Sequence, residues 1–154
     1  MVESGVAAAE GPTAMATRLR VGTDLQRVDA VEESLRTLGR RYVERVFTDH
    51  EQECVGLPVD DLPSVAPGLA ARFAAKEATI KVLRPVDGGI GWRDIEVRRH
   101  EGGWCSVELS GTAAMLAERA GLGSFALSFS HESGFAVATV IAVEESSDGS
   151  GQDR

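Results

Sequence analysis

The sequence predicts an α+β domain in which helices pack on a small, largely antiparallel sheet. Three observations favour this class: an alternating apolar segment opens the patterned part of the chain, helical spacing dominates residues 28–83, and alternation returns over most of residues 92–143. The chain has 154 residues, of which 43% are hydrophobic, so it can bury the core of one ordinary domain.

The two ends of the chain differ from the rest in composition. Residues 1–17 and 146–154 are rich in small and polar side chains and show no apolar periodicity. Such segments bury too little apolar surface to offset the entropy lost on ordering. We therefore expect a disordered tail at each end and a single domain over residues 18–145.

The first patterned segments predict a strand followed by short helices. Residues 19–25 alternate apolar and polar side chains, with Asp24 at the end of this strand. Apolar residues recur at helical spacing over residues 28–38 and again over residues 42–46. Residues 48–51 (TDHE) form a capping-box pattern, which predicts that another short helix starts there.

The helix predicted from Leu69 to about Leu83 is apolar on almost every side, because alanines fill most positions outside its face of larger apolar residues. A helix with so little polar surface is expected in the middle of the fold. It nevertheless carries four charged side chains that require an explanation: Arg72, Lys76, Glu77 and Lys81.

The second half of the chain predicts four strands and one helix. The strands are expected over residues 92–98, 104–109, 124–130 and 135–143, with a glycine turn at 102–103 and a helix over 112–120. The last strand is apolar on both of its alternating faces. Because one small domain covers only one face, this pattern predicts that a neighbouring subunit covers the other.

Composition excludes several classes of partner. A formal charge of −8 argues against nonspecific binding to nucleic acid, which needs a basic surface. The first residues lack the basic start and apolar run of a secretion signal, and no apolar stretch is long enough to span a membrane. We therefore expect a cytoplasmic protein without a membrane partner. Cys54 and Cys105 lack metal-ligand spacing and are expected to be reduced structural thiols.

A buried ionised group costs several kcal/mol unless it is paired or binds a metal, so Glu77 requires a partner. Two interpretations stand side by side. In one, Glu77 bridges to Lys81 one turn later, while Arg72 and Lys76 extend to solvent. In the other, Glu77 binds a hard cation together with a second carboxylate, for which Asp24 is the candidate. Asp24 alone also fits the role of a helix cap.

Four motifs follow one another along the chain. They are residues 22–24 (GTD), residues 44–51 (ERVFTDHE), residues 72–81 (RFAAKEATIK) and residues 128–131 (SFSH), the last followed by an apolar strand. In this order and spacing they resemble the holo-acyl-carrier-protein synthases, a family of small phosphopantetheinyl transferases. The resemblance extends over roughly residues 20–143.

This resemblance implies transfer of the 4′-phosphopantetheine arm of coenzyme A to a serine of an apo acyl carrier protein, with release of adenosine 3′,5′-bisphosphate. It implies that Asp24 and Glu77 hold Mg²⁺, an ion that usually needs only one or two protein carboxylates beside substrate phosphates. Lys81 would steady the transferring phosphoryl or the leaving group. The groups implied to hold the phosphates of coenzyme A are Arg72, Lys76, Lys81, Ser130 and His131.

The family resemblance also implies a homotrimer with active sites between subunits. The general base stays open, with His131, Glu132 and a water on the metal as candidates. An unperturbed histidine has a suitable pKa near about 6.5. A histidine at the end of a strand is, however, equally common as a structural residue.

Arginines concentrate in one part of this acidic chain. Five of its sixteen basic residues lie within residues 27–45, namely Arg27, Arg36, Arg40, Arg41 and Arg45. Carrier proteins are acidic, so this cluster is a candidate surface for steering and docking the partner. The alternative is a solvated helix face laced with Glu32, Glu33 and Glu44.

One segment departs from the family pattern. Where members commonly have a Gly-Thr-Gly turn after the charged helix, this chain has residues 84–89 (RPVDGG), and Pro85 lacks an amide donor. The change bears on coenzyme A affinity, and it suggests a polyketide or peptide assembly line in place of fatty-acid synthesis. Two rival hypotheses are an inactive homologue that binds a carrier or coenzyme A without transfer, and an unrelated coenzyme A or nucleotide-binding module.

Overall fold

Three strands drawn from both ends of the chain form one antiparallel sheet. The computed structural model describes residues 18–86 and 89–145, and the predicted tails lie outside these described residues. The sheet has the order β1-β5-β4 and contains β1 (Arg18–Arg27), β5 (Phe135–Glu144) and β4 (Leu122–Glu132). Residue 18 pairs with residue 144 at one end, and residue 27 with residue 135 at the other.

A second antiparallel sheet contains β2 (Ile95–Arg99) and β3 (Cys105–Leu109). Gly102 and Gly103 in the turn between them have φ angles of 90° and 87°, a region that favours glycine. The strand expected from residue 92 begins three residues later, because Trp92–Asp94 forms a short 3₁₀ helix, η2. The predicted α+β class with antiparallel sheets is confirmed, with the strands divided between two sheets.

The helices that sequence periodicity predicts are present. They are α1 (Val28–Leu38), α2 (Arg40–Val46), α3 (Asp49–Cys54), α4 (Ala66–Leu83) and α5 (Gly111–Arg119), with a 3₁₀ turn η1 (Leu62–Val65) before α4. The capping box of α3 forms as predicted. Glu51 N donates to Thr48 Oγ1 at 3.3 Å, and Thr48 N donates to Glu51 Oε2 at 2.8 Å.

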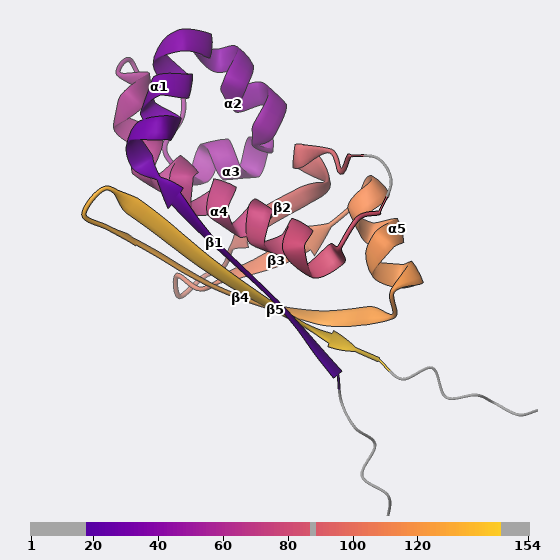
Figure 1. Cartoon of the computed structure of the whole chain (residues 1–154). Helices are drawn as coiled ribbons and strands as arrows, with labels where there is room; N and C mark the ends of the chain where they lie inside the picture. Colours follow the sequence, from indigo (N-terminus) through magenta and orange to yellow (C-terminus); the bar gives the residue numbers. More distant parts are fainter. Residues whose placement is uncertain (1–17, 87–88, 146–154) are drawn as a thin grey trace, which may run out of the picture.

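α4 lies in the middle of the fold, across the inner face of the three-stranded sheet (Figure 1). Its alanines are buried, and three of the four fully buried residues of β5 are alanines too: Ala136, Ala138 and Ala142, with Val140 as the fourth. The buried core has two parts that meet along α4, one beneath α1 and α2 and one beneath β2, β3 and α5. The expected central place of this helix is therefore confirmed.

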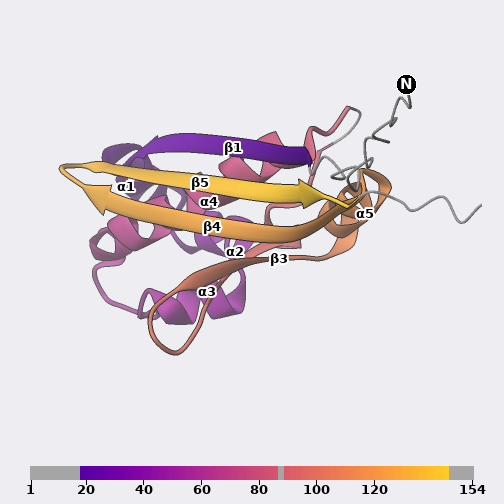
Figure 2. The same cartoon turned by 90° about the horizontal axis from the view of Figure 1, so that it is seen from below.

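The other face of the same sheet is open. In Figure 2, β1, β5 and β4 lie in front and helices α1 to α4 lie behind them. The outward-pointing apolar side chains include Leu25, 64% exposed, Leu19, 59% exposed, and Phe135, 45% exposed. β5 is thus buried on one face only within a single chain. No helix in the described parts of the chain is long and apolar enough to cross a membrane.

Candidate active site

β1 and α4 approach each other unusually closely at Gly22. A Cβ atom at this position would lie 2.0 Å from the carbonyl oxygen of Ala78 and 3.1 Å from Val82 Cγ2. Because inner and outer residues alternate along a strand, Asp24 lies on the same inner face of β1 as Gly22. The Gly-x-Asp sequence therefore brings the Asp24 carboxylate directly beside α4.

Asp24 is paired with Lys81 of α4. Lys81 Nζ lies 2.9 Å from Asp24 Oδ1 and donates to the Thr23 carbonyl oxygen at 2.7 Å. The Asp24 side chain is 17% exposed and that of Lys81 is 49% exposed. The pair thus lies at the edge of the core, where a ligand can reach it from solvent.

Glu77 lies one turn before Lys81 on the same partly exposed stripe of α4. Burial raises the pKa of Glu77 above its ordinary value, the negative charge of Asp24 raises it further, and Lys81 acts in the opposite direction. The two carboxylates are therefore close enough to repel each other. Paired carboxylate oxygens beside an open surface suit a hard divalent cation, so these residues fit Mg²⁺.

The structure does not contain the simpler arrangements that the sequence left open. Lys81 pairs with Asp24, and among the described residues no ion pair joins it to Glu77. Asp24 does not cap a helix either, because β1 continues to Arg27 and that residue occupies the N-cap of α1. Asp24, Glu77 and Lys81 instead come together as one cluster, which we call the carboxylate site.

Lys76 does not contact this site or the solvent. Its side chain is fully buried and pairs with Glu51 of α3 at 2.8 Å. The expectation that Lys76 holds a phosphate of coenzyme A is therefore wrong for this conformation, because the ammonium group is already enclosed by protein acceptors. The alternative expectation, that Lys76 extends to solvent, is wrong for the same reason.

Glu51 is the functional candidate that sequence reasoning missed. The capping-box pattern identified its bond to the backbone of Thr48, but gave no sign of a second role. Its partner is 25 positions away in another helix, and such a pairing between elements has no local sequence signal. A completely buried Lys–Glu pair in the centre of the fold is found only from the coordinates.

Arg72 opens into a cavity of about 420 Å³, which we call the Arg72 cavity. Its walls include Arg99 and His131 beside Arg72. Arg72 is only 5% exposed, and its Nη1 donates to the Gly68 carbonyl oxygen at 3.0 Å. Within the described residues Arg72 Nε has no hydrogen-bond partner. A buried guanidinium with a spare donor, flanked by further basic groups, suits an anionic ligand.

Ser130 and His131 point to opposite sides of β4. His131 lies in the wall of the Arg72 cavity. Ser130, its neighbour, is exposed and faces the open side of the sheet with the residues that alternate with it. One chain therefore brings Arg72 and His131 together and leaves Ser130 on the outer face.

Both cysteines are free thiols, in agreement with their predicted reduced state. Although the sequence suggests unrelated contexts for them, Cys54 and Cys105 line the same Arg72 cavity. Burial raises the pKa of Cys105, and Arg72 and Arg99 act in the opposite direction. The thiol of Cys105 is thus less acidic than an ordinary cysteine.

The five arginines proposed to face a partner are all exposed, but they do not form one patch. Arg41 and Arg45 border a second cavity of about 420 Å³, which we call the Arg41–Arg45 groove. Its other walls are mainly apolar and consist of Leu38, Tyr42, Val46, Phe73 and Trp92. Arg27 pairs with Asp29 at the far end of α1, and Arg36 pairs with Glu32.

Within residues 18–86 and 89–145 no group of three or more His, Cys, Asp or Glu side chains is arranged to hold a metal. The carboxylate site supplies two candidate ligand side chains, those of Asp24 and Glu77. Two carboxylates are a usual protein contribution to a Mg²⁺ site in which waters and substrate phosphates complete the coordination shell.

Comparison with known proteins gives a consistent family. The sequence model of the 4′-phosphopantetheinyl transferase superfamily matches residues 20–140. A holo-[acyl-carrier-protein] synthase of Gloeobacter violaceus is 41% identical over 125 residues, which cover 80% of this chain and 92% of that protein.

Solved structures agree with the sequence relatives. An ACPS–CoA complex of Chronobacterium ammoniagenes has a TM-score of 0.72 and 30% identity, covering 83% of this chain and 98% of that one. A holo-(acyl-carrier-protein) synthase of Bacillus anthracis, in complex with CoA (3′,5′-ADP), has a TM-score of 0.65 and 28% identity, covering 84% and 100%.

The chain therefore belongs to the 4′-phosphopantetheinyl transferase superfamily. The resemblance of its four motifs to the holo-acyl-carrier-protein synthases is confirmed by the identities and coverage of these relatives. The rival hypothesis of an unrelated coenzyme A or nucleotide-binding module is thereby excluded.

Proposed function

We propose that the protein transfers 4′-phosphopantetheine from coenzyme A to a serine of an apo acyl carrier protein in a Mg²⁺-dependent reaction, releasing adenosine 3′,5′-bisphosphate. The observation that carries this proposal is the carboxylate site, in which Asp24 and Glu77 approach each other beside Lys81. The superfamily to which the chain belongs and its relatives named holo-[acyl-carrier-protein] synthase support the same reaction.

Asp24 and Glu77 are the residues that would hold Mg²⁺. The ion supplies electrostatic stabilisation of the diphosphate oxygens on which negative charge builds during transfer. Lys81 has a separate task. In the free protein its ammonium group forms an ion pair with Asp24 and a hydrogen bond to the Thr23 carbonyl oxygen. Because the side chain is long, flexible and half-exposed, it can turn to the phosphoryl oxygens when substrate binds.

The Arg72 cavity is the proposed site for a phosphate of coenzyme A, with the 3′-phosphate as the candidate. The unpartnered Nε of Arg72 and the positive charge of Arg99 support this assignment, and His131 adds a further donor. His131 faces this cavity, so we assign it to phosphate binding and leave the general base open between Glu132 and a water.

The carrier protein is proposed to dock at the Arg41–Arg45 groove. An acidic helix with apolar side chains complements two arginines above an apolar floor. Phe73 lines this groove and lies four residues before Glu77 on the same stripe of α4, about 6 Å along the helix axis. A carrier bound there would present its serine next to the carboxylate site. Arg27, at the far end of α1, is not part of this surface.

We infer that the protein assembles through the open face of the three-stranded sheet, as a homotrimer by family resemblance. The exposed apolar residues of β1 and β5 on this face support association, since a monomer rarely leaves such a patch uncovered. Ser130 faces the same side, so assembly would bring it against another subunit, where it can contribute to a shared site.

One assay tests the reaction directly. The protein, Mg²⁺ and coenzyme A are incubated with several apo carriers, and each carrier is weighed by mass spectrometry. The expected result is a gain of about 340 Da on the carrier serine, lost when the metal is chelated. No gain on any carrier, with coenzyme A binding retained, would favour the binding-only homologue.

The same assay distinguishes the pathways, because the carriers that react identify the enzyme as serving fatty-acid synthesis or a polyketide or peptide assembly line. The expected cytoplasmic location is tested separately by cell fractionation.

A further inference from the structure

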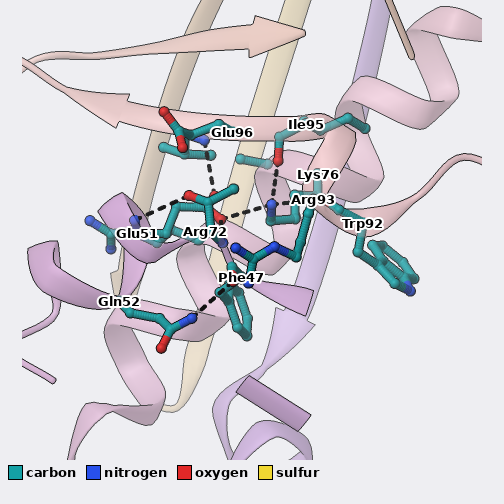
Figure 3. Close-up of polar contacts among 12 residues, drawn as sticks. Phe47, Glu51, Gln52, Arg72, Lys76, Trp92, Arg93, Ile95 and Glu96 are labelled. Atoms are coloured by element: carbon teal, nitrogen blue, oxygen red, sulfur yellow. Dashed lines mark hydrogen bonds and ion pairs between the residues drawn. The ribbon is translucent and has the colours of Figure 1, made fainter. Parts of the chain in front are cut away.

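A fully buried ion pair joins α4 to α3 and β2 in the centre of the molecule. Lys76 Nζ lies 2.8 Å from Glu51 Oε2, and both side chains are 0% exposed. Lys76 also donates to the carbonyl oxygens of Trp92, at 2.9 Å, and Ile95. Figure 3 shows these three acceptors around the ammonium group. Each of its three N–H bonds therefore has a partner.

Both carboxylate oxygens of Glu51 also have hydrogen-bond partners. Its Oε2 also accepts from Thr48 N at 2.8 Å, and its Oε1 accepts from Val97 N at 2.9 Å. A single carboxylate thus contacts the start of α3, the middle of β2 and the middle of α4. Removal of either charged group alone would leave the other buried without its partner.

Stability alone does not account for this pair. Taking each ion out of water costs several kcal/mol, and replacing a buried ion pair with apolar residues of similar volume is often neutral or stabilising. The cost is visible in Lys76, since burial lowers its pKa below the ordinary value while Glu51 acts in the opposite direction. What the pair adds is a defined orientation of α4, because hydrogen bonds have a preferred geometry and apolar contacts do not.

α4 needs such a constraint on its orientation because many of its other contacts are made by small side chains. The larger buried apolar residues of the helix lie toward its ends: Leu69, Val82 and Leu83. Between them its buried surface is mostly alanine and packs near Gly22 of β1 and the small residues of β5. Small side chains form shallow ridges, so they set how close the helix lies but define its rotation about its own axis only weakly. The bonds of Lys76 to Glu51, Trp92 and Ile95 fix that rotation.

The rotation of α4 decides where the functional groups point. Glu77 follows Lys76 directly and is turned from it by about 100°, whereas Arg72 lies one turn earlier on nearly the same side as Lys76. A helix has a radius of about 5–6 Å with its side chains, so a rotation of about 20° moves those groups by about 2 Å. Displacements of about 1 Å at a reacting group can cost about a hundredfold in rate.

We propose that the Glu51–Lys76 pair is a positioning device that sets the rotation of α4, so that Glu77 meets Asp24 while Arg72 faces its cavity. This inference rests on the proposed function of the carboxylate site. Neither Glu51 nor Lys76 touches the metal or the substrate in this role, and both act through the residues that α4 carries.

The test uses the neutral double variant Glu51→Gln/Lys76→Met, which keeps the side-chain volumes and removes both charges. Affinity for Mn²⁺, a spectroscopic probe of the carboxylate site, is measured by electron paramagnetic resonance in the presence of coenzyme A. The expected result is a folded protein in which Mn²⁺ affinity falls about 10–100-fold. We also expect kcat of transfer to fall at saturating carrier, because Glu77 would no longer meet Asp24.

The matched control is Val107→Ala, a core change in β3 that leaves both charged groups of the pair in place. Each variant is measured the same number of degrees below its own Tm. A structural role alone predicts equal Mn²⁺ affinity in the control and the double variant, and that result would overturn the proposal. If the double variant does not fold, Glu51→Gln/Lys76→Gln decides, because it leaves no buried charge without a partner and supplies polar groups for the backbone partners of both side chains. Unchanged Mn²⁺ affinity in it would also overturn the proposal. Absence of transfer by the wild-type protein tests the proposed function separately, since Mn²⁺ binding is read without turnover.

Discussion

At the scale of single residues, Gly22 controls how closely β1 approaches α4. We expect Gly22→Ala to destabilise the fold by about 1–3 kcal/mol, because the new Cβ would lie 2.0 Å from a backbone oxygen of Ala78 and the strand or the helix must move. Thermal denaturation measures the loss. Gly89→Ala is the control, because among the described residues, its chain neighbours aside, no atom lies within 4 Å of its added Cβ. Equal Tm values for both variants would contradict the close approach.

At the carboxylate site, the ionised form of Glu77 that would bind the metal is also the form that lowers the stability of the fold. Its pKa is raised in the folded protein by burial and then by Asp24, so folding favours its protonated form. The ionised carboxylate therefore lowers stability, and this penalty develops as pH rises from the unfolded pKa toward the raised folded value. We expect Glu77→Gln to raise Tm by about 1–4 °C at pH 7 without metal, corresponding to at most about 1 kcal/mol after solvent screening.

The pH dependence and the metal dependence check this explanation. Below the ordinary pKa of a glutamate, Glu77 is protonated in both states, so the Tm advantage of Glu77→Gln should vanish near pH 4. Added Mg²⁺ should raise the Tm of the wild-type protein and have little effect on the variant. An advantage that persists at low pH would indicate a cause other than ionisation. Transfer activity should be abolished in Glu77→Gln.

At the scale of elements, α4 shows which parts of the fold follow from local pattern. Its near-complete apolar surface predicts a central helix, and the family resemblance of the four motifs implies that Asp24 and Glu77 belong to one site. The Lys76–Glu51 pair could not be predicted in the same way, since it depends on how α3 and α4 are placed relative to each other. Periodicity reports which side of an element is buried, but it does not report which buried group meets which.

The same limit explains two other differences. The predicted strand 92–98 includes residues 92–94, yet these form the 3₁₀ helix η2, and the Trp92 carbonyl accepts from Lys76. Arg99 lies in one cavity with Arg72 and His131 because β2 and β4 both pack against α4, an arrangement that has no local sequence signal. The motifs thus predict which chemical groups the sites contain, whereas packing between elements determines which residues come together in each site.

The Arg41–Arg45 groove gives a prediction about α2 and its partner. We expect Arg41→Glu/Arg45→Glu to raise KM for the acyl carrier protein roughly tenfold or more, because two attractive charges become repulsive toward an acidic partner. KM for coenzyme A should change little. Steady-state kinetics at several salt concentrations measures both, and the wild-type KM for the carrier should rise with salt. Arg27→Glu serves as the control, and an equal effect there would show that only net charge matters.

At the scale of the whole molecule, the open sheet face predicts assembly. We expect Leu25→Glu/Val137→Glu to convert the protein to monomers, because two charges would be buried between subunits without partners. Sedimentation velocity measures the mass, and a loss of transfer with loss of assembly would indicate that sites are shared between subunits. Val86→Glu is the matched control, since Val86 is 92% exposed and lies outside this face. A variant that keeps its assembled mass would exclude this face as the interface.

The pairing of the first described strand with the last has a practical consequence for engineering. Arg18 and Glu144 are register partners, so the two ends of the domain lie side by side on the neighbouring strands β1 and β5, at one end of the sheet. A linker of a few residues should therefore join them in a circular permutant, with new termini opened at the exposed glycine turn between β2 and β3. Such a permutant would move both chain ends away from that end of the three-stranded sheet and leave the order of strands in space unchanged.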